Sequence, residues 1–279
     1  MRGAYRSRVP PPPSRYTDLD RPPLRPADVD RARLAPWTAI ELYDELGSTN
    51  QLAAAAARAG VASGLVVVAE LQTGGRGRLG RQWVSPARAG LTLSVLLRPA
   101  VPVAQWPWLL GLAAVAAATS IRDRTEVDVR LKWPNDLVVE DRKLGGLLAE
   151  IVDDAVVIGL GVNVTTRRAE LPRPDATSLL LEGADPADRL PLLLSLLRQV
   201  GTDFVAWNDG DGASGPLLAA YRGLCTTIGR QVRAELPDGS AVEGVAVDID
   251  ANGHLVIDTG ASSRSIAAAD VVHLRPMDC

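Results

Sequence analysis

Cysteine and histidine are both scarce in this chain of 279 residues. It has two cysteines, Cys225 and Cys279, and two histidines, His254 and His273. So few residues build neither a disulfide framework nor a clustered metal site, and they disfavour a histidine-based catalytic triad. Because no disulfide framework is predicted, we expect the protein to work in a reducing cytoplasm.

Long apolar runs and an excess of positive charge are also missing. The longest apolar stretch, residues 109–118, is too short to cross a bilayer, and the N-terminus lacks the apolar core of a secretory signal. The net charge of −3 and a pI near 5.5 argue against a general nucleic-acid-binding protein. With 47% hydrophobic and 23% charged residues, the composition is typical of a globular protein without a DNA or membrane partner.

The chain divides into a tail and two folded regions. Residues 1–36 contain four consecutive prolines and many charges, which predicts a dispensable tail that is mostly disordered or polyproline-like, with room for a short helix near residues 26–34. Residues 37–224 have the helix and strand patterns of one large domain. Residues 225–279 hold short strands separated by PDG and ANG turns, which predicts a small SH3-like β barrel.

Hydrophobic periodicity predicts the elements of these regions. An alanine-rich helix at 51–58 is followed by longer helices at 106–121 and 190–207. Two-residue turns at Asp141-Arg142 and Asp153-Asp154 predict antiparallel pairing of the strands that they join. The expected strands are 64–70, 91–97, 127–133, 137–140, 143–152 and 155–164, and in the C-terminal region 231–236, 241–250, 254–258 and 265–274.

Residues 75–83, GRGRLGRQW, alternate glycine with arginine and end in Trp83. Glycine permits a close backbone approach, and each guanidinium offers a planar fork of donors for a carboxylate or a phosphate. A solvated charged face is the ordinary interpretation of such a run. However, no Asp or Glu occurs between residues 71 and 97, so the arginines have no acidic neighbour along the chain. This favours a loop that wraps an anion from outside the protein.

Polar residues mark the start of the first helix and the approach to the arginine loop. Ser48, Thr49 and Asn50 can serve as a plain N-cap, or their hydroxyl and amide groups can contact the polar head of a ligand. Gln72 leads from the strand at 64–70 into the loop.

The segments KWPND and RKLGG place two lysines beside an expected hairpin. The residue before a proline is held extended, so Lys132, Asn135 and Asp136 are presented in a fixed turn. Asp136 can hold Mg²⁺ beside phosphates, although an ordinary Asx turn explains the same residues. Lys143 begins the next strand, where it suits a ligand oxygen, although a lone lysine is ordinarily a surface residue.

Glycines inside strands need a physical reason, and a close ligand approach is one. Gly145-Gly146 and the segment GLGVN, which ends at Asn163, both have this character. GLGVN is not a dinucleotide-binding fingerprint, because no helix follows at the required spacing.

Taken together and in this order, the segments STN, QTGGRGRLGRQW, KWPNDL, RKLGGLLAE and GLGVNV closely resemble the biotin–protein ligase family. The resemblance extends from about residue 38 to residue 276. GRGRxGRxW and KWPND are its most specific motifs. It implies an α+β fold, with a catalytic domain built on a mixed sheet with helices, as in class II synthetases, followed by the SH3-like barrel.

The resemblance also implies an activity. Enzymes of this family join biotin to ATP as biotinyl-5′-AMP and transfer the biotinyl group to a lysine of a biotin carboxyl carrier domain. The implied ligands are therefore biotin and ATP as substrates, with Mg²⁺, and the implied partner is the carrier domain. We expect a monomer or a weak homodimer. No covalent enzyme nucleophile is required, in agreement with the scarcity of cysteine and histidine.

Site residues follow by matching motifs. Lys143 is the implied active-site lysine, and Arg78 is the second residue implied in catalysis, on a loop that orders over the adenylate. The residues implied to bind biotin are Ser48, Thr49, Asn50, Gln72, Arg76, Gly77, Arg78, Lys143 and Gly146. The residues implied to bind ATP are Arg78, Arg81, Trp83, Lys132, Asn135, Asp136 and Asn163, with Asp136 also implied for Mg²⁺.

Two features depart from the family pattern. There is no room for a winged-helix DNA-binding domain before Trp37, so we expect no repressor activity. Residues 165–179, implied to order over adenine, contain no aromatic residue, which puts the stacking contact of some relatives in doubt.

Two other functions compete with this interpretation. A lipoate or octanoyl ligase of the same superfamily shares the hairpin lysine but is not expected to carry GRGRxGRxW. A non-enzymatic RNA-binding module would explain the RGR run. It predicts a basic surface with scattered aromatic residues, whereas this chain is acidic and Trp83 is the only aromatic near the arginines.

Overall fold

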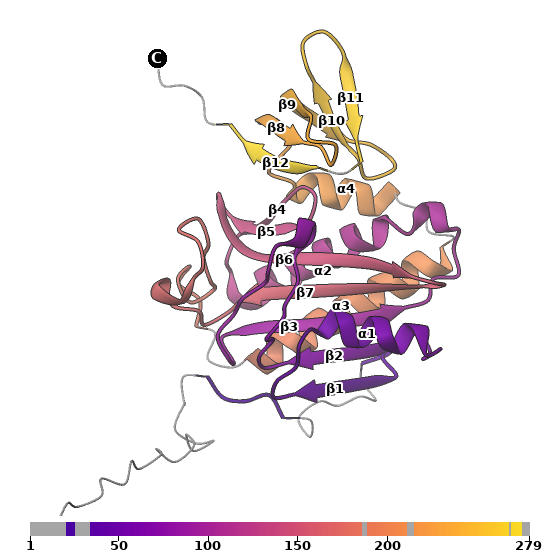
Figure 1. The fold of residues 1–279 in the computed structure, drawn as a ribbon, viewed down its shortest axis with the longest axis vertical. Coiled ribbons are helices and arrows are strands. Elements are labelled where there is room, and N and C mark those ends of the chain that lie inside the picture. The colour runs from indigo at the N-terminus through magenta and orange to yellow at the C-terminus, as the bar shows by residue number, and fades with distance from the viewer. Residues whose placement is uncertain (1–20, 26–33, 186–188, 211–214, 268, 275–279) are drawn as a thin grey trace, which may run out of the picture.

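The computed structural model describes residues 21–25, 34–185, 189–210, 215–267 and 269–274. A seven-stranded sheet forms the centre of the large domain, with the strand order β1-β2-β3-β7-β6-β5-β4 (Figure 1). β1 and β2 are parallel, and every other neighbouring pair is antiparallel, so the sheet is mixed as expected. Its strands are β1 (Ala39–Tyr43), β2 (Leu65–Ala69), β3 (Gly90–Leu97), β4 (Val129–Lys132), β5 (Asp136–Val139), β6 (Arg142–Val152) and β7 (Ala155–Asn163).

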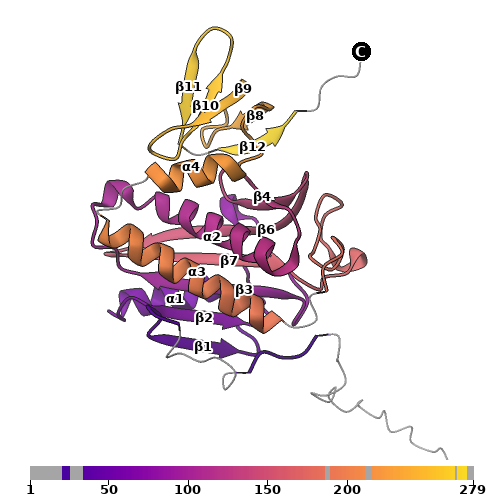
Figure 2. The same ribbon diagram turned by 180° about the vertical axis from the view of Figure 1, so that it is seen from behind.

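Helices cover both faces of this sheet. α1 (Thr49–Arg58) lies on one face, and α2 (Trp108–Thr125) and α3 (Arg189–Asp209) lie on the other, as the opposite views in Figures 1 and 2 show. α4 (Gly215–Leu224) packs against α2 and leads toward the C-terminal region. Among the described residues, no helix is both long enough and apolar enough to span a membrane.

α1 owes its position to its cap and its small side chains. The Ser48 hydroxyl accepts from the Gln51 N–H at 3.5 Å, which confirms the predicted cap, and the helix begins at Thr49 rather than Gln51. Ala53 and Ala57 are buried against the sheet, and alanine allows a helix to approach a sheet closely. This close approach places the start of α1 at the cavity described below.

Most predicted helices and strands of the large domain are confirmed. β1 and α4 had no prediction, because neither combines a long periodic pattern with clear end signals. The β5–β6 turn is one residue earlier than predicted, at Glu140-Asp141 instead of Asp141-Arg142. Glu140 has φ of 55°, so the non-glycine residue takes the left-handed conformation that the turn requires.

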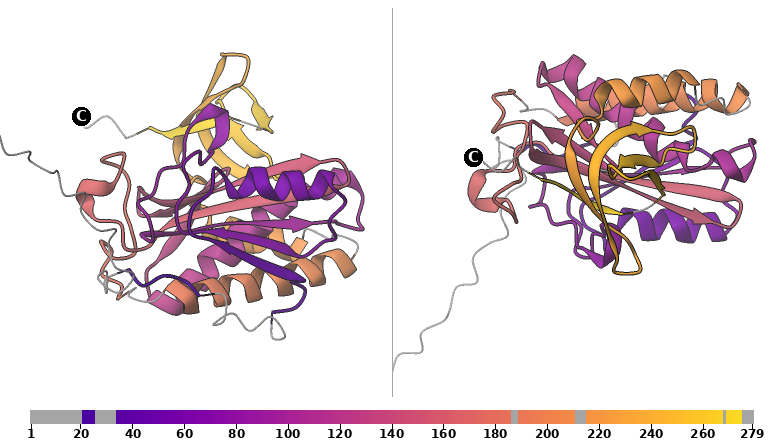
Figure 3. Two further views of the ribbon diagram at one scale, coloured as in Figure 1. Left: turned by 60° about the horizontal axis from the view of Figure 1, so that its bottom comes forward. Right: turned by 90° about the horizontal axis from the view of Figure 1, so that it is seen from above.

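The C-terminal strands form a separate antiparallel sheet at the β4 side of the large domain, beside α4 (Figure 1), and Figure 3 shows it from two further directions. The order is β11-β10-β9-β8-β12, and in the described residues the pairing does not close into a ring. The predicted strand at 265–274 is in fact parts of two strands. The five are β8 (Gln231–Glu235), β9 (Ala241–Ile249), β10 (Leu255–Asp258), β11 (Ser263–Ile266) and β12 (Asp270–His273). The expected α+β fold, with a small β region after the large domain, is confirmed.

The predicted tail needs a correction at residues 21–25 and 34–36. Arg21, Leu24 and Leu34 are all buried, so these stretches pack on the body of the protein. Isolated leucines between prolines have no periodicity, which is why composition alone predicted disorder. The other residues of the predicted tail, 1–20 and 26–33, lie outside the described residues.

Candidate functional site

A cavity of about 530 Å³ lies where the ends of the central strands, the arginine loop and β12 meet. Its volume falls in the usual range for small-molecule sites. Every residue that the resemblance implied for binding biotin or ATP lines it, although they come from five segments of the chain. They are Ser48, Thr49, Asn50, Gln72, Arg76, Gly77, Arg78, Arg81, Trp83, Lys132, Asn135, Asp136, Lys143, Gly146 and Asn163.

The start of α1 forms a hydrogen-bonded network with β3. Gln72 Oε1 accepts from both Thr49 N at 2.7 Å and Thr49 Oγ1 at 3.0 Å. The fully buried Ser94 hydroxyl donates to Asn50 Oδ1 at 2.6 Å and lies 2.7 Å from Thr49 Oγ1. The sequence analysis missed Ser94. Its signal was the alternation of Thr92 and Ser94 in an otherwise apolar strand, which places two hydroxyls on one face.

Asn50 is fixed from its other side by β6 and β7. Its amide nitrogen donates to Leu148 O at 3.4 Å and to Glu150 Oε2 at 3.3 Å. A Cβ at Gly159 would collide with the Asn50 side chain, so this strand glycine makes room for the amide. Glu150 is a second residue that the sequence analysis missed, because nothing local distinguishes it from a solvent-facing strand carboxylate.

The arginine loop is an ordered hairpin. Trp83 N donates to Gly75 O at 3.0 Å, and Gly77 N donates to Arg81 O at 2.7 Å. A short 3₁₀ turn, Arg78–Gly80, closes its tip, where Leu79 is 63% exposed. The paired backbone on the two sides of this turn, with a bridge between Arg76 and Gln82, fixes the directions in which the arginine side chains leave the backbone.

Trp83 packs directly on β7. A Cβ at Gly161 would lie inside the indole ring's contact distance, so only glycine lets the ring reach the strand backbone. The Trp83 indole N–H is buried, and it has no hydrogen-bond partner among the described residues. A buried donor without a partner is costly, so a ligand acceptor in the cavity would stabilise it.

The arginines of the loop have partners within the protein. This corrects the expectation that only an anion from outside the protein could bind them. Arg81 forms an ion pair with Asp270 of β12. Arg78 donates to Asn135 Oδ1 at 3.4 Å and to Ala269 O at 3.3 Å, and its burial lowers its pKa. The acidic partner lies 189 residues away in the sequence, so a search of neighbouring positions could not find it.

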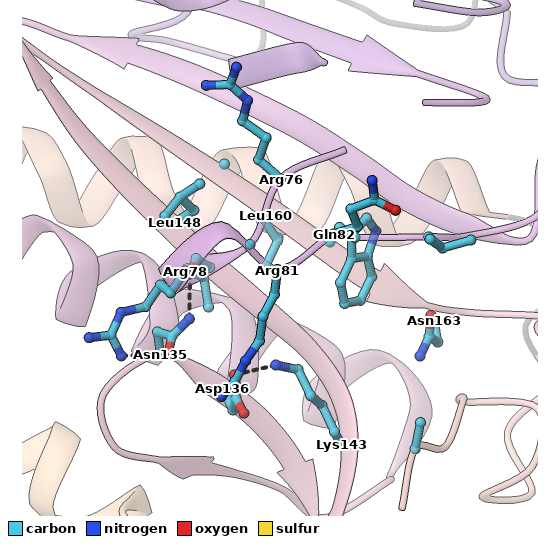
Figure 4. A pocket seen from close by; sticks show the side chains of 18 of the residues that line it. Arg76, Arg78, Arg81, Gln82, Asn135, Asp136, Lys143, Leu148, Leu160 and Asn163 are labelled. Carbon is cyan, nitrogen blue, oxygen red and sulfur yellow. Dashed lines mark hydrogen bonds and ion pairs between the residues drawn. The ribbon is translucent and has the colours of Figure 1, made fainter. Parts of the chain in front are cut away.

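Arg76 lies apart from the other two arginines. Figure 4 shows its guanidinium pointing away from Lys143 and Asp136, while Arg78 reaches Asn135. The Gln51 side-chain oxygen, when it faces Arg76, accepts from this guanidinium at 2.5 Å. The loop therefore presents its cations in two directions, one toward α1 and the other toward the β5–β6 hairpin.

Lys143 is held by a carboxylate within its own hairpin. Its Nζ donates to Asp136 Oδ1 at 2.6 Å (Figure 4). A Cβ at Gly146 would lie 3.4 Å from Lys143 Nζ and 3.5 Å from Asp136 Oδ1, so Gly146 lies directly beside this pair. The ammonium is thereby fixed at the cavity wall with donors left for a ligand.

Lys132 lies near this pair. Burial lowers its pKa, and the charge of Asp136 opposes that shift. The whole chain contains only two lysines among 30 basic residues, and both line the cavity. This rarity was a signal that the sequence analysis did not use, since the exposed cations of the protein are arginines.

The residues present fit a magnesium ion only as the companion of a phosphate ligand. In the described part of the chain, no three His, Cys, Asp or Glu side chains gather in a way that could hold a metal. Asp136 offers one carboxylate, and one of its oxygens already accepts from Lys143. Mg²⁺ is often held by one or two carboxylates together with substrate phosphates, so this arrangement is compatible with ATP-borne Mg²⁺.

Residues 165–179 cross the start of β6 and form one wall of the cavity. Lys143 N donates to Asp175 O and Thr177 N donates to Lys143 O, both at 2.8 Å. Asn163 Nδ2 donates to Thr177 O at 2.9 Å, so the Asn163 amide holds this wall. Its implied contact with ATP stays a prediction. The wall residues that line the cavity are Pro172, Arg173, Asp175 and Ala176.

Two protein-family models match the chain. Residues 45–163 match the biotin/lipoate A/B protein ligase family. Residues 227–274 match the biotin protein ligase C terminal domain. The first match covers the central sheet from β2 to β7 with α1 and α2, and the second covers the C-terminal sheet.

Known proteins resemble the chain over most of its length. It is 43% identical over 244 residues to the biotin–[acetyl-CoA-carboxylase] ligase of Mycobacterium tuberculosis, a match covering 86% of this chain and 90% of that protein. It is 31% identical to the bifunctional ligase/repressor BirA of Bacillus subtilis, covering 82% and 72%. The solved biotin protein ligase from Aquifex aeolicus in complex with biotin and ATP superposes with a TM-score of 0.73 at 25% identity, covering 85% of this chain and 100% of that one.

Proposed function

The chain belongs to the biotin/lipoate A/B protein ligase family, and we propose that its cavity forms biotinyl-5′-AMP and hands the biotinyl group to a carrier protein. It is a biotin–protein ligase, with biotin and ATP as its substrates. The observation that carries the proposal is the gathering of Lys132, Lys143 and Arg78 around one cavity. The chemistry of adenylation requires such a cluster of cations.

Adenylation brings two anions together. One carboxylate oxygen of biotin attacks the α-phosphorus of ATP, the bond from that phosphorus to the pyrophosphate oxygen breaks, and biotinyl-5′-AMP and pyrophosphate form. The barrier falls when fixed cations neutralise the reacting oxygens and hold them in line. We assign this role to Lys143, which Asp136 keeps oriented, with Lys132 and Arg78 at the phosphates. Mg²⁺ on the ATP phosphates would neutralise further charge, and Asp136 is the residue that would hold it.

Biotin recognition is assigned to the start of α1 and to Gln72. The network of Thr49, Asn50 and Ser94 presents hydroxyl and amide groups in one fixed arrangement, as a polar bicyclic head requires. These groups hold one another in place, and a ligand that cannot bond to the free positions of this fixed set leaves buried polar atoms unpaired, which discriminates between ligands. Gly159 and Gly161 leave the space that the Asn50 amide and the Trp83 ring occupy at this end of the cavity.

The second half-reaction needs an amine from another protein. A neutral carrier lysine attacks the carbonyl carbon of biotinyl-5′-AMP, the bond to the phosphate oxygen breaks, and the amine loses a proton as the amide and AMP form. The adenylate is a mixed anhydride that water hydrolyses, so it must be retained until the carrier arrives. We assign retention to the arginine loop, whose Arg78 and Trp83 line the cavity.

The family comparison disfavours the two competing functions. The Mycobacterium tuberculosis relative and the Aquifex aeolicus structure are both named as biotin ligases rather than lipoate ligases. The RNA-binding interpretation loses its main support, because Arg81 pairs within the protein and Arg78 is buried against Asn135. A monomer or weak homodimer, a cytoplasmic location and the lack of DNA and membrane partners stay predictions.

Biotin-dependent exchange of pyrophosphate into ATP tests the proposal. The purified protein with ATP, Mg²⁺ and labelled pyrophosphate should incorporate label when biotin is added. Lipoate or octanoate at the same concentration should give no more than the blank. Equal exchange with lipoate would move the activity to the rival ligase, and no exchange with any acid would refute adenylation.

A further inference from the structure

Residues 21–25, which we call the N-terminal strap, reach the cavity wall formed by residues 165–179. Arg21 is 7% exposed, and both terminal nitrogens of its guanidinium contact the Glu170 carboxylate. Its NH1 donates to Glu170 Oε1 at 3.1 Å, and its NH2 donates to Glu170 Oε2 at 2.5 Å and to Thr165 O at 2.9 Å. Three bonds from one planar group fix both the position and the orientation of that stretch.

The strap is itself tied to the centre of the protein. Leu24 N donates to Glu70 Oε1 at 2.6 Å, and Pro22 O accepts from Arg189 NH2 at 2.8 Å. Glu70 and Arg189 form a buried ion pair at 2.6 Å, where each side chain is at most 5% exposed. Because the strap is anchored to this pair, Arg21 links the wall to the end of β2 and the start of α3.

Glu170 lies two residues before Pro172, the first residue of the wall that lines the cavity. The wall from Pro172 to Ala176 is attached on its C-terminal side to Lys143, through the two backbone hydrogen bonds described above, and to Asn163. On its N-terminal side, Thr165 N donates to Ala89 O at 2.8 Å. Between that anchor and the wall, the side-chain attachment runs through Glu170 to Arg21, and Arg168 NH1 adds a bond within the segment to Ala176 O at 2.8 Å. Hydrogen bonding to Arg21 is the main cause that lowers the Glu170 pKa, so the carboxylate stays charged in this contact.

The wall faces the cationic side of the cavity. It pairs with the backbone of Lys143, and the charge of Arg173 contributes to lowering the Lys132 pKa. Under the proposed function, these lysines hold the phosphates of ATP. Displacement of the wall should therefore disturb the nucleotide before it disturbs biotin, which contacts the α1 network.

We propose that Arg21 is a positioning residue for ATP, acting through Glu170 on the wall at residues 172–176 without touching the substrate. This inference rests on the proposed function. It gives a function to residues 21–25, which the composition predicted to be part of a dispensable tail. It also distinguishes Arg21 from Arg25, which is exposed on the same strap.

The test compares Arg21→Ala with Arg25→Ala in the full chain. Pyrophosphate exchange gives KM for ATP and for biotin, and hydrogen–deuterium exchange follows peptides from residues 165–179. For Arg21→Ala we expect KM for ATP to rise roughly tenfold, KM for biotin to change less than twofold, and the wall peptides to exchange faster. Arg21→Lys should fall between, because an ammonium keeps the charge but loses the fork. Arg25→Ala should match the parent protein.

The outcomes separate the inference from the function beneath it. If the parent protein shows no biotin-dependent exchange, the proposed function fails, and faster deuterium exchange of the wall in Arg21→Ala still decides whether the strap holds it. If the parent is active and Arg21→Ala leaves KM for ATP and the wall peptides unchanged, or raises both KM values equally, the inference is wrong. If Arg21→Ala does not fold, Glu170→Gln serves instead, because it leaves the strap's anchors at Glu70 and Arg189 in place.

Discussion

The arginine loop and the β5–β6 hairpin face one another across the cavity, yet they are held in different ways. In the hairpin, Lys143 and Asp136 are seven residues apart and pair across one tight turn. In the loop, Arg78 and Arg81 reach Asn135 and the C-terminal sheet, with partners as far as 191 residues away. The charged groups of the hairpin therefore hold each other in place within one short segment. The arginines of the loop are held by contacts with other parts of the protein, including the C-terminal region.

This difference suggests a division of labour. A pair within one hairpin keeps its lysine in a fixed position, as adenylation requires. An element held by long-range contacts can close over the product and retain it. The C-terminal sheet touches both regions, since Asp270 pairs with Arg81 while Arg230 pairs with Asp141 at the hairpin turn. Substitutions on the two sides should affect different steps.

The largest effect is expected at the hairpin. Lys143→Ala removes the oriented ammonium and should slow single-turnover formation of biotinyl-5′-AMP by about 10²- to 10³-fold. Lys143→Arg keeps the charge and serves as the matched control, with a smaller loss. A near-normal rate for Lys143→Ala would show that this lysine does not contribute to adenylation. The proposed difference between the hairpin and the loop would then be wrong.

An intermediate effect is expected at the loop. Arg78→Ala loses its bonds to Asn135 and Ala269, so free biotinyl-5′-AMP should escape about 10- to 100-fold faster. Because the chain offers only two lysines, escape is best scored by biotinylation of an added lysine-rich bystander protein. Arg124→Ala, an exposed arginine at the end of α2, is the control. Unchanged bystander labelling would contradict the retention role.

A smaller effect is expected at the contact between loop and C-terminal sheet. Asp270→Asn removes the charge that pairs with Arg81, whose side chain is 55% exposed. Exposed ion pairs contribute about 0–1 kcal/mol, so release should accelerate by at most about fivefold. The parent protein should release biotinyl-5′-AMP faster at high salt, because salt screens the ion pair, and Asp270→Asn should lose that salt dependence. A change as large as that of Arg78→Ala would mean that the sheet, rather than the loop, retains the adenylate.

The smallest effect concerns pH at the junction of β12 with the hairpin turn. Burial first, then Lys132 and Arg230, lower the His273 pKa from 6.5 to about 4. Between these values the unfolded chain binds a proton that the folded chain excludes, so stability falls as pH drops from 6.5 toward 4. His273→Gln should flatten this slope in thermal unfolding measured at pH 6.5 and pH 5. His254→Gln should keep it, and an equal slope in both variants would contradict the assignment.

The same contrast explains how much the sequence could predict. The helices and strands of the large domain follow from periodicity, and the site residues follow from motifs that sit at strand ends. The Ser48 cap needed only three neighbouring residues. Two predictions about the chain's organisation were wrong in part, since residues 21–25 and 34–36 pack on the body, and the strand at 265–274 is interrupted.

What the sequence could not provide were partners that the fold brings together. Asp270 reaches Arg81 and Glu170 reaches Arg21 across more than a hundred residues, and neither acid is marked by its neighbours. Ser94 and the two lysines are different, because the sequence itself contained a pattern that marked each of them. A polar residue in a buried strand, and lysine restricted to two positions in an arginine-rich chain, both pointed to the cavity.

The central claim is that the hairpin forms the adenylate and the arginine loop retains it. A single-turnover experiment with labelled biotin, separating enzyme-bound from free biotinyl-5′-AMP over time, tests both parts in one measurement. We expect Lys143→Ala to form almost none, and Arg78→Ala to form it with a much smaller loss of rate and then lose it to solution. If Arg78→Ala were as slow in formation as Lys143→Ala and released nothing, the two regions would share one role and the account would be wrong.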